Sequence, residues 1–370
     1  MDFAKRTVVM LMMLFFVVQG LSGQERAIDH APIGVMGDHY HGKGEWMVSL
    51  RHMRMSMAGN RDGTSDLTDG AIIKLENPYQ MGTMSTKLSV VPQQMTMGMT
   101  MAGAMYAPSD TLTLMAMGMF TSKVMDLNTY QGAMPMSGMS GMTGMTGMTG
   151  MARTQLGSFT TSSSDLSDVS LSGLIRLYEG DVSRVHAQLG LQQSIGANDS
   201  TGSVLTPMNS RTMMILPYGM QIGDGATSVL SGITYVAELG RRVYGTQVRA
   251  RNAFATDDWN FGDNLSLTGW VQQELNDTTS VSFRATRYKQ DAISGRNTAI
   301  VAPVQTANPA NYGGTMTEVS VGLNRLVYLF PGEHSDRIGI EVSYPVSQNL
   351  NGPQMKSGAT IQIGYQKSLN

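Results

Sequence analysis

The feature that most constrains this chain of 370 residues is an alternation of apolar and polar residues with a period of two. In "RVHAQLGLQQS" (184–194), Val185, Ala187 and Leu189 alternate with polar residues or glycine. Because successive side chains of a β-strand point to opposite faces, the pattern predicts strands with one apolar and one polar face. It recurs in twelve segments, which are 45–55, 94–106, 111–120, 168–178, 184–194, 227–239, 243–254, 264–275, 279–289, 317–328, 337–344 and 357–366.

The connections between these segments are short and long in turn. Five of them are turns of two to six residues, which read "APSD", "EGDVS", "GRR", "ND" and "PGEHSD". The connections between these turns are mostly much longer, and they span 57–93, 121–166, 195–226, 255–262, 290–314 and 345–356. Outer-membrane barrels have short periplasmic turns, long extracellular loops and an even number of strands. The predicted fold is therefore all-β, an antiparallel transmembrane β-barrel of about 12 strands.

Residues 1–23 predict a secretory signal peptide. Lys5 and Arg6 precede an apolar run at 8–18, and the small residue Gly23 ends the segment. The run is too short to cross a bilayer as a helix. A barrel exported in this way is predicted to lie in the outer membrane of a Gram-negative cell.

The remainder of the chain is predicted to form two parts. Residues 24–44 are a periplasmic N-terminal segment, and residues 45–370 are the barrel, in which 121–166 is a long extracellular loop rich in Met, Gly and Thr. The predicted partners are outer-membrane lipid and the barrel assembly machinery. The chain ends "YQKSLN", whereas many such barrels end on an aromatic residue that this machinery reads.

Composition excludes several classes of function. Charged residues make up 15% of the chain and the formal net charge is -2, so a basic footprint for nucleic acid is absent. There is no cysteine, which removes disulfides and thiolate metal sites. The sequence has no nucleophile-elbow motif, and no serine is singled out beside a histidine. We therefore expect a protein that is not an enzyme.

Four stretches carry a resemblance to a known family. They read "HAPIGVMGDHYHGKGEWMVSLRHMRMSMAGNRDGT", "GAMYAPSDTLTLMAM", "LPYGMQIGDGATSVLSGITY" and "GPQMKSGATIQIGYQ". These stretches resemble bacterial outer-membrane barrels that are usually labelled transporters or proteins of the meta-pathway of phenol degradation. The resemblance implies an outer-membrane barrel, brings no catalytic residues and says little about the substrate.

Histidines concentrate near the predicted mature N-terminus, where four of the six lie within residues 30–52. His39 and His41 are two residues apart, so an extended backbone points both to the same side. Imidazole suits copper, zinc and nickel, and thioether sulfur selects Cu(I). The alternative is a segment that folds into the barrel and uses these groups for hydrogen bonds. The candidate metal ligands are His30, Met36, Asp38, His39 and His41.

A second candidate metal site is the repeat "PMSGMSGMTGMTGMTGM" (135–151), in the long loop. A polyproline II helix has three residues per turn, which would align the methionines along one edge. The alternative is an inert repeat expansion. The methionines are Met136, Met139, Met142, Met145, Met148 and Met151.

Strand parity identifies residues that are predicted to line the lumen, because the apolar face of each strand should meet lipid. For segment 94–106 the parity stays open, since its methionines alternate with Thr, Gly and Ala. Methionine can also be plain apolar filler, and the charged residues can pair and seal the lumen. The predicted lumen residues are Met47, Arg51, Met53, Met55, Met115, Met117, Met119, Arg176, Arg184, His186, Arg249, Arg251, Arg284, Glu318 and Glu341.

Two functions follow from these patterns. The first is an outer-membrane transporter or channel for a small solute whose identity the sequence does not reveal. The alternative is an outer-membrane protein that binds or handles copper, or another soft metal, through Met and His side chains. The sequence predicts no cofactor apart from copper on that alternative.

Overall fold

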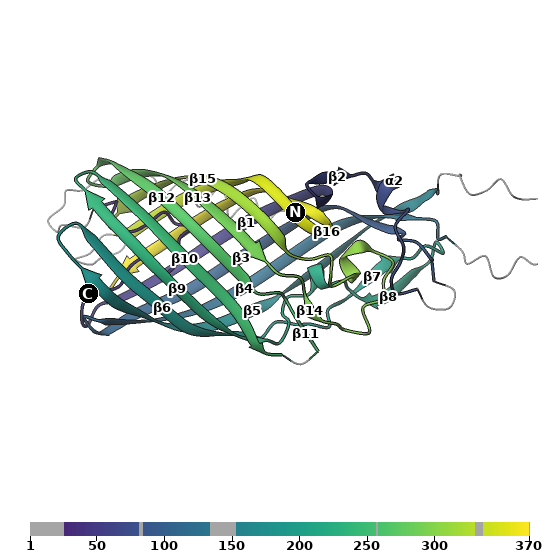
Figure 1. Cartoon of the computed structure of the whole chain (residues 1–370), viewed down its shortest axis with the longest axis horizontal. Helices are drawn as coiled ribbons and strands as arrows, with labels where there is room; N and C mark the ends of the chain where they lie inside the picture. Colours follow the sequence, from purple (N-terminus) through teal and green to yellow (C-terminus); the bar gives the residue numbers. More distant parts are fainter. Residues whose placement is uncertain (1–25, 81–83, 134–152, 257, 330–335, 370) are drawn as a thin grey trace, which may run out of the picture.

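The chain forms a closed antiparallel barrel (Figure 1). The computed structural model describes residues 26–80, 84–133, 153–256, 258–329 and 336–369. Each barrel element pairs with its neighbours in the chain, and β16 pairs with β1 to close the ring. The elements are β1 (Trp46–Gly63), β3 (Val90–Ser109), β4 (Leu112–Tyr130), β5 (Gln155–Glu179), β6 (Ser183–Ser194), β9 (Thr227–Leu239), β10 (Arg242–Ala255), β12 (Asn264–Asn276), β13 (Thr279–Gln290), β15 (Gly314–Val327) and β16 (Asp336–Ser368).

The long element β16 is a hairpin, which gives the barrel twelve crossings. Residues 336–350 pair antiparallel with β15, and residues 350–368 pair antiparallel with β1. A ring in which every neighbour is antiparallel needs an even number of strands, so β16 must reverse its direction. The side chain of Gln348 joins the two halves, because its Nε2 donates to the carbonyl of Ser357 and its Oε1 accepts from the Ser357 N–H. The backbone turns at Gly352, where φ is 75°. The predicted all-β barrel of about 12 strands is confirmed.

The twelve predicted segments lie in barrel strands apart from the end residues Glu45, Thr111 and Tyr328, but the strands extend further on the long-loop side. The predicted loop 121–166 is wrong at both ends, because β4 continues to Tyr130 and β5 begins at Gln155. The two strands stay paired throughout this extension, although the Ser- and Thr-rich sequence has little hydropathy contrast. At 19 and 25 residues these strands are longer than a membrane crossing requires.

The outer face of the barrel is apolar. Leu171, Leu189 and Val321 expose 59–64% of their surface, and they alternate with buried or half-buried residues of the inner face. Large exposed apolar surface of this kind faces lipid in a membrane barrel. Among the described residues, no helix is long and apolar enough to cross a bilayer.

The long loops form a cap at one end of the barrel, opposite the short turns (Figure 1). Small elements build it: β2 (Ser65–Leu67), α2 (Asp69–Ile72), β7 (Thr201–Leu205), β8 (Arg211–Ile215), η2 (Tyr218–Met220), β11 (Trp259–Asn260), β14 (Ser294–Gly295) and η3 (Gln305–Ala307). Tyr218 and Trp259 pack edge to face, 4.7 Å between ring centroids, within a buried cluster that includes Ile300 and Val304. We call these elements and this cluster together the extracellular cap, after the side of the membrane on which the long loops are predicted to lie.

Candidate functional site

The N-terminal segment lies inside the barrel and fills the end at which the short turns lie. Ile28, Ile33 and Val35 are at most 3% exposed. Ile28 and Val35 share a buried cluster with Trp270 of the barrel wall. We call residues 26–44 the plug. This observation agrees with the alternative that the segment folds into the barrel.

Barrel side chains bind the backbone of the plug. The plug has no regular secondary structure, so its buried carbonyl groups need partners from elsewhere. Arg51 Nη1 donates to the carbonyls of Ile33 and Val35 at 3.0 and 2.9 Å, and His186 Nε2 lies 2.8 Å from the carbonyl of Gly37. Five further barrel side chains donate to plug carbonyls: Gln247 to that of Met36, Gln272 to that of His30, Ser280 to that of Ala27, Arg184 to that of Asp29 and Arg337 to that of Ala31.

The predicted lumen charges point inward, and several of them are paired. Arg284 Nη2 lies 2.5 Å from Glu341 Oε1 and 3.5 Å from Glu318 Oε1, and all three side chains are buried. Arg176 pairs with Glu179 and lies 4.6 Å over the ring of Tyr40 in the plug. This pairing lowers the cost of charge within the barrel.

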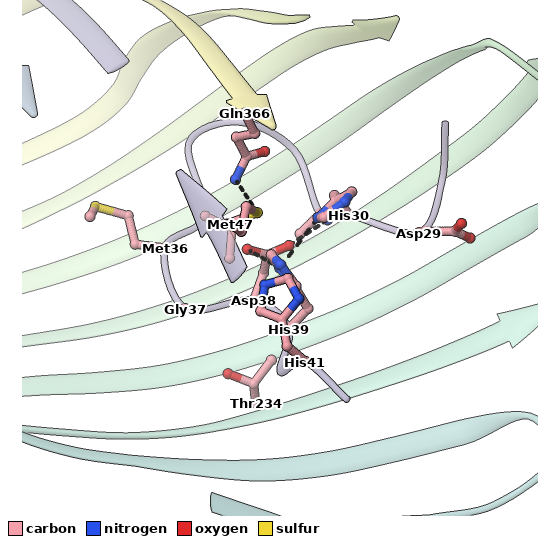
Figure 2. Close-up of polar contacts among 12 residues, drawn as sticks. Asp29, His30, Met36, Gly37, Asp38, His39, His41, Met47, Thr234 and Gln366 are labelled. Carbon is pink, nitrogen blue, oxygen red and sulfur yellow. Dashed lines mark hydrogen bonds and ion pairs between the residues drawn. The ribbon is translucent and has the colours of Figure 1, made fainter. Parts of the chain in front are cut away.

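Of the predicted metal ligands in the plug, His30, Asp38, His39 and His41 come together, whereas the side chain of Met36 points away from them (Figure 2). Ligand atoms of His30, Asp38 and His39 all lie within 4.8 Å of one another. His39 Nδ1 is 3.1 Å from Asp38 Oδ1, and its ring packs edge to face with His41 at 4.8 Å between centroids. Within the described chain, the buried Nε2 atoms of His39 and His41 have no hydrogen-bond partner.

Burial and neighbouring charge shift the pKa of three groups in the plug. Burial lowers the pKa of His30 well below its usual value and, with the charge of His39, lowers the pKa of His41 to about 4. Burial alone would raise the pKa of Asp38, but the charge and hydrogen bond of His39 hold it well below its usual value. For His30 and His41, the neutral imidazole that burial favours is the form that binds metal.

A methionine wall covers one side of the lumen. Met105 on β3 stands directly opposite Met47 on β1 and Met115 on β4, so the three side chains share the inner face. The open parity of segment 94–106 is thereby resolved, because register shows that its odd-numbered residues point inward. The wall consists of Met47, Met53, Met55, Met57, Met95, Met97, Met99, Met101, Met105, Met115, Met117, Met119 and Met125.

The wall runs along the lumen past three regions. At the outer end, Met95 and Met125 belong to the extracellular cap. In the middle, Met97, Met99 and Met119 line a cavity of about 520 Å³, which we call the chamber. At the inner end, five wall methionines line a cavity of about 20 Å³ against the plug; these are Met47, Met101, Met105, Met115 and Met117.

The lining of the chamber also includes polar and charged residues. Arg249 and Arg251 line the chamber from β10, and Asp168 and Asp224 add negative charge. Lys123, whose Nζ donates to the Gln221 carbonyl at 2.6 Å, also lines the chamber. The chamber therefore offers thioether and charged surfaces to one small occupant.

Some predicted residues lie elsewhere. The repeat methionines Met136, Met139, Met142, Met145, Met148 and Met151 lie outside the described residues, as does the predicted signal peptide. His52 is exposed on the outer face, where its Nδ1 lies 2.9 Å from Thr100 Oγ1, so it is apart from the other early histidines. Sequence reasoning missed Lys123 and Met125, because both lie where a loop was predicted.

Comparison with known proteins supports the fold. No family model and no curated protein matches the sequence. The chain is similar to the structure of the COG4313 outer membrane channel from Pseudomonas putida F1, with a TM-score of 0.54 and 11% identity over 91% of this chain and 100% of that one. This likeness shows the fold, that of an outer-membrane β-barrel.

Two further structures are similar at lower TM-scores. One is a Pseudomonas aeruginosa FadL homologue, with a TM-score of 0.40 and 8% identity over 88% of this chain and 91% of that one. The other is a mutant of the TodX monoaromatic hydrocarbon channel, with a TM-score of 0.42 and 11% identity over 89% of this chain and 91% of that one. The resemblance to the meta-pathway family stays a prediction.

Proposed function

We propose that this protein is an outer-membrane channel for a small solute, and that the plug holds its lumen closed. The observation that carries the proposal is the chamber of about 520 Å³ between the plug and the extracellular cap. Small-molecule sites have volumes of roughly 300–1,000 Å³, so the chamber suits one small solute. The apolar outer face and the predicted signal peptide support a location in the Gram-negative outer membrane.

Liposome swelling tests this function. Liposomes that contain the mature protein should swell slowly in small sugars and amino acids, and a variant without residues 26–44 should swell quickly. A variant without residues 134–151 is the matched control, because it loses a similar length of chain outside the plug, and it should behave like the parent protein. If the folded variant without residues 26–44 admits no solute, the channel function is wrong.

A second candidate is the handling of copper(I) or silver(I). The observation that favours it is the methionine wall, which follows the lumen from the extracellular cap to the plug. Thioether sulfur is a soft ligand that selects Cu(I), and methionine needs no deprotonation to bind it. Uptake of Ag(I) into liposomes by the variant without residues 26–44 tests this candidate. A rate equal to that of a methionine-poor barrel would contradict it.

A further inference from the structure

We infer that the inner end of the methionine wall and the plug form a preformed site for one soft monovalent cation, Cu(I) or Ag(I). The inference makes the second candidate function specific and rests on it. The site is the cavity of about 20 Å³ where Met36, Asp38 and His39 of the plug meet Met47, Met105 and Met115 of the wall. A cavity of this volume has room for one water-sized particle.

The three wall sulfurs come from neighbouring strands in direct register. Met47 pairs with Met105, and Met105 pairs with Met115. Directly opposite residues on a sheet have Cβ atoms about 5 Å apart, which flexible methionine side chains can close to bring their sulfurs together. The three residues form one buried cluster and are 2–5% exposed.

The plug contributes groups that ordinary packing does not need. His39 is 7% exposed, and among the described residues its Nε2 atom has no hydrogen-bond partner. A buried polar atom without a partner is unfavourable, and a bound cation would satisfy it. Met36 of the plug also borders the cavity, although its side chain points away from Asp38 and His39 (Figure 2). Figure 2 shows Met47, Asp38 and His39 gathered at this place, with Gln366 directed at the sulfur of Met47.

Charge at the site favours a single positive charge. The side chain of Asp38 is 2% exposed, lines the cavity and has its Oδ1 3.1 Å from His39 Nδ1. Arg51 also lines the cavity, but its Nη1 is directed to the plug carbonyls of Ile33 and Val35. Neutral thioethers add no charge and Arg51 already balances Asp38, so a monovalent ion leaves less excess positive charge in the site than a divalent ion would. Softness and charge therefore both select Cu(I) or Ag(I) over Zn²⁺.

The experiment is an isothermal calorimetric titration of the purified mature protein with Ag(I) in chloride-free detergent buffer. We expect one tight site per chain. The triple variant Met47→Leu, Met105→Leu and Met115→Leu keeps the side-chain volumes and should fold, which heat-modified gel migration checks. It should lose at least about tenfold in affinity. The matched control is Met213→Leu, which replaces a methionine that is 65% exposed in the cap, and it should bind as the parent protein does.

Further measurements decide among the outcomes. His39→Gln should weaken binding, and X-ray absorption of the Cu(I)-loaded protein should show sulfur ligands. Tight binding that survives the triple variant but disappears when residues 134–151 are deleted would overturn this site while leaving metal handling intact. Tight Zn²⁺ binding without Ag(I) binding would also overturn it. Solute flux in the variant without residues 26–44 tests the channel function independently of every one of these results.

Discussion

Replacing Arg51 with leucine should loosen the plug. Arg51 is 6% exposed, and its Nη1 donates to the carbonyls of Ile33 and Val35 at 3.0 and 2.9 Å. Leucine removes both bonds. The carbonyl of Ile33 keeps a bond from Gln362 Nε2 at 3.3 Å, so the carbonyl of Val35 is the one left unpaired. An unpaired buried group costs about 1–3 kcal/mol, so the docked plug should lose roughly 1–3 kcal/mol. That change shifts the ratio of closed to open plug by roughly 5-fold to 160-fold.

Single-channel recording in planar bilayers measures this shift. The parent protein should show rare openings, and Arg51→Leu should show a large increase in open probability at an unchanged conductance per opening. The matched control is Arg54→Leu on the same strand, because Arg54 is exposed on the outer face, and its open probability should stay at the parent level. An Arg51→Leu barrel that folds and opens as rarely as the parent would refute the assignment of Arg51 as an anchor of the plug.

Two substitutions test the energetics of the barrel wall. Glu341→Gln removes the carboxylate that lies 2.5 Å from Arg284. It should lower the free energy of unfolding in urea by about 3 kcal/mol. This value is at the low end for a broken buried ion pair, because Glu318 remains 3.5 Å from Arg284. Gly245→Val should cost about 1–3 kcal/mol in the same assay, because Gly245 stands opposite Trp270 and an added Cβ would overlap the indole ring.

Each of these substitutions has a control in the same barrel. Glu76→Gln changes an ion pair whose carboxylate is 74% exposed, and it should cost less than about 1 kcal/mol. For Gly118→Ala, an added Cβ meets no atom of the described chain within 4 Å, so the substitution should leave the unfolding midpoint nearly unchanged. If the control substitutions destabilise the barrel as much as the test substitutions, packing and pairing inside the lumen do not have the roles assigned to them.

Strand positions could be predicted because hydropathy contrast was strong where lipid meets the barrel. In β6, Leu189 and Leu191 alternate with Gln188 and Gly190, so both the strand and its faces were readable. In β3 the residues between the methionines are small or weakly polar, and only pairing with β1 and β4 decided which face is inward. Register between strands is a tertiary property that a single segment does not contain.

The plug illustrates a second limit. Sequence spacing placed His39 and His41 on one side of an extended segment, and it placed Arg51 in the lumen. The bond from Arg51 to the carbonyl of Ile33 depends on how the segment threads the barrel, and backbone carbonyls carry no sequence signal. The extended ends of β4 and β5 were missed because their Ser- and Thr-rich residues resemble a loop.

The most direct test of the plugged channel is a disulfide that locks the plug. The chain has no cysteine, and a Cβ added at Gly339 would lie 2.8 Å from the Cβ of Ile33. Bridged cysteines have Cβ atoms about 3.8 Å apart, so Ile33→Cys with Gly339→Cys should form a bond after a small shift of the plug. In the Arg51→Leu background, the oxidised barrel should pass almost no current and the reduced barrel should open. A current that does not change on reduction of the formed disulfide would contradict the central claim.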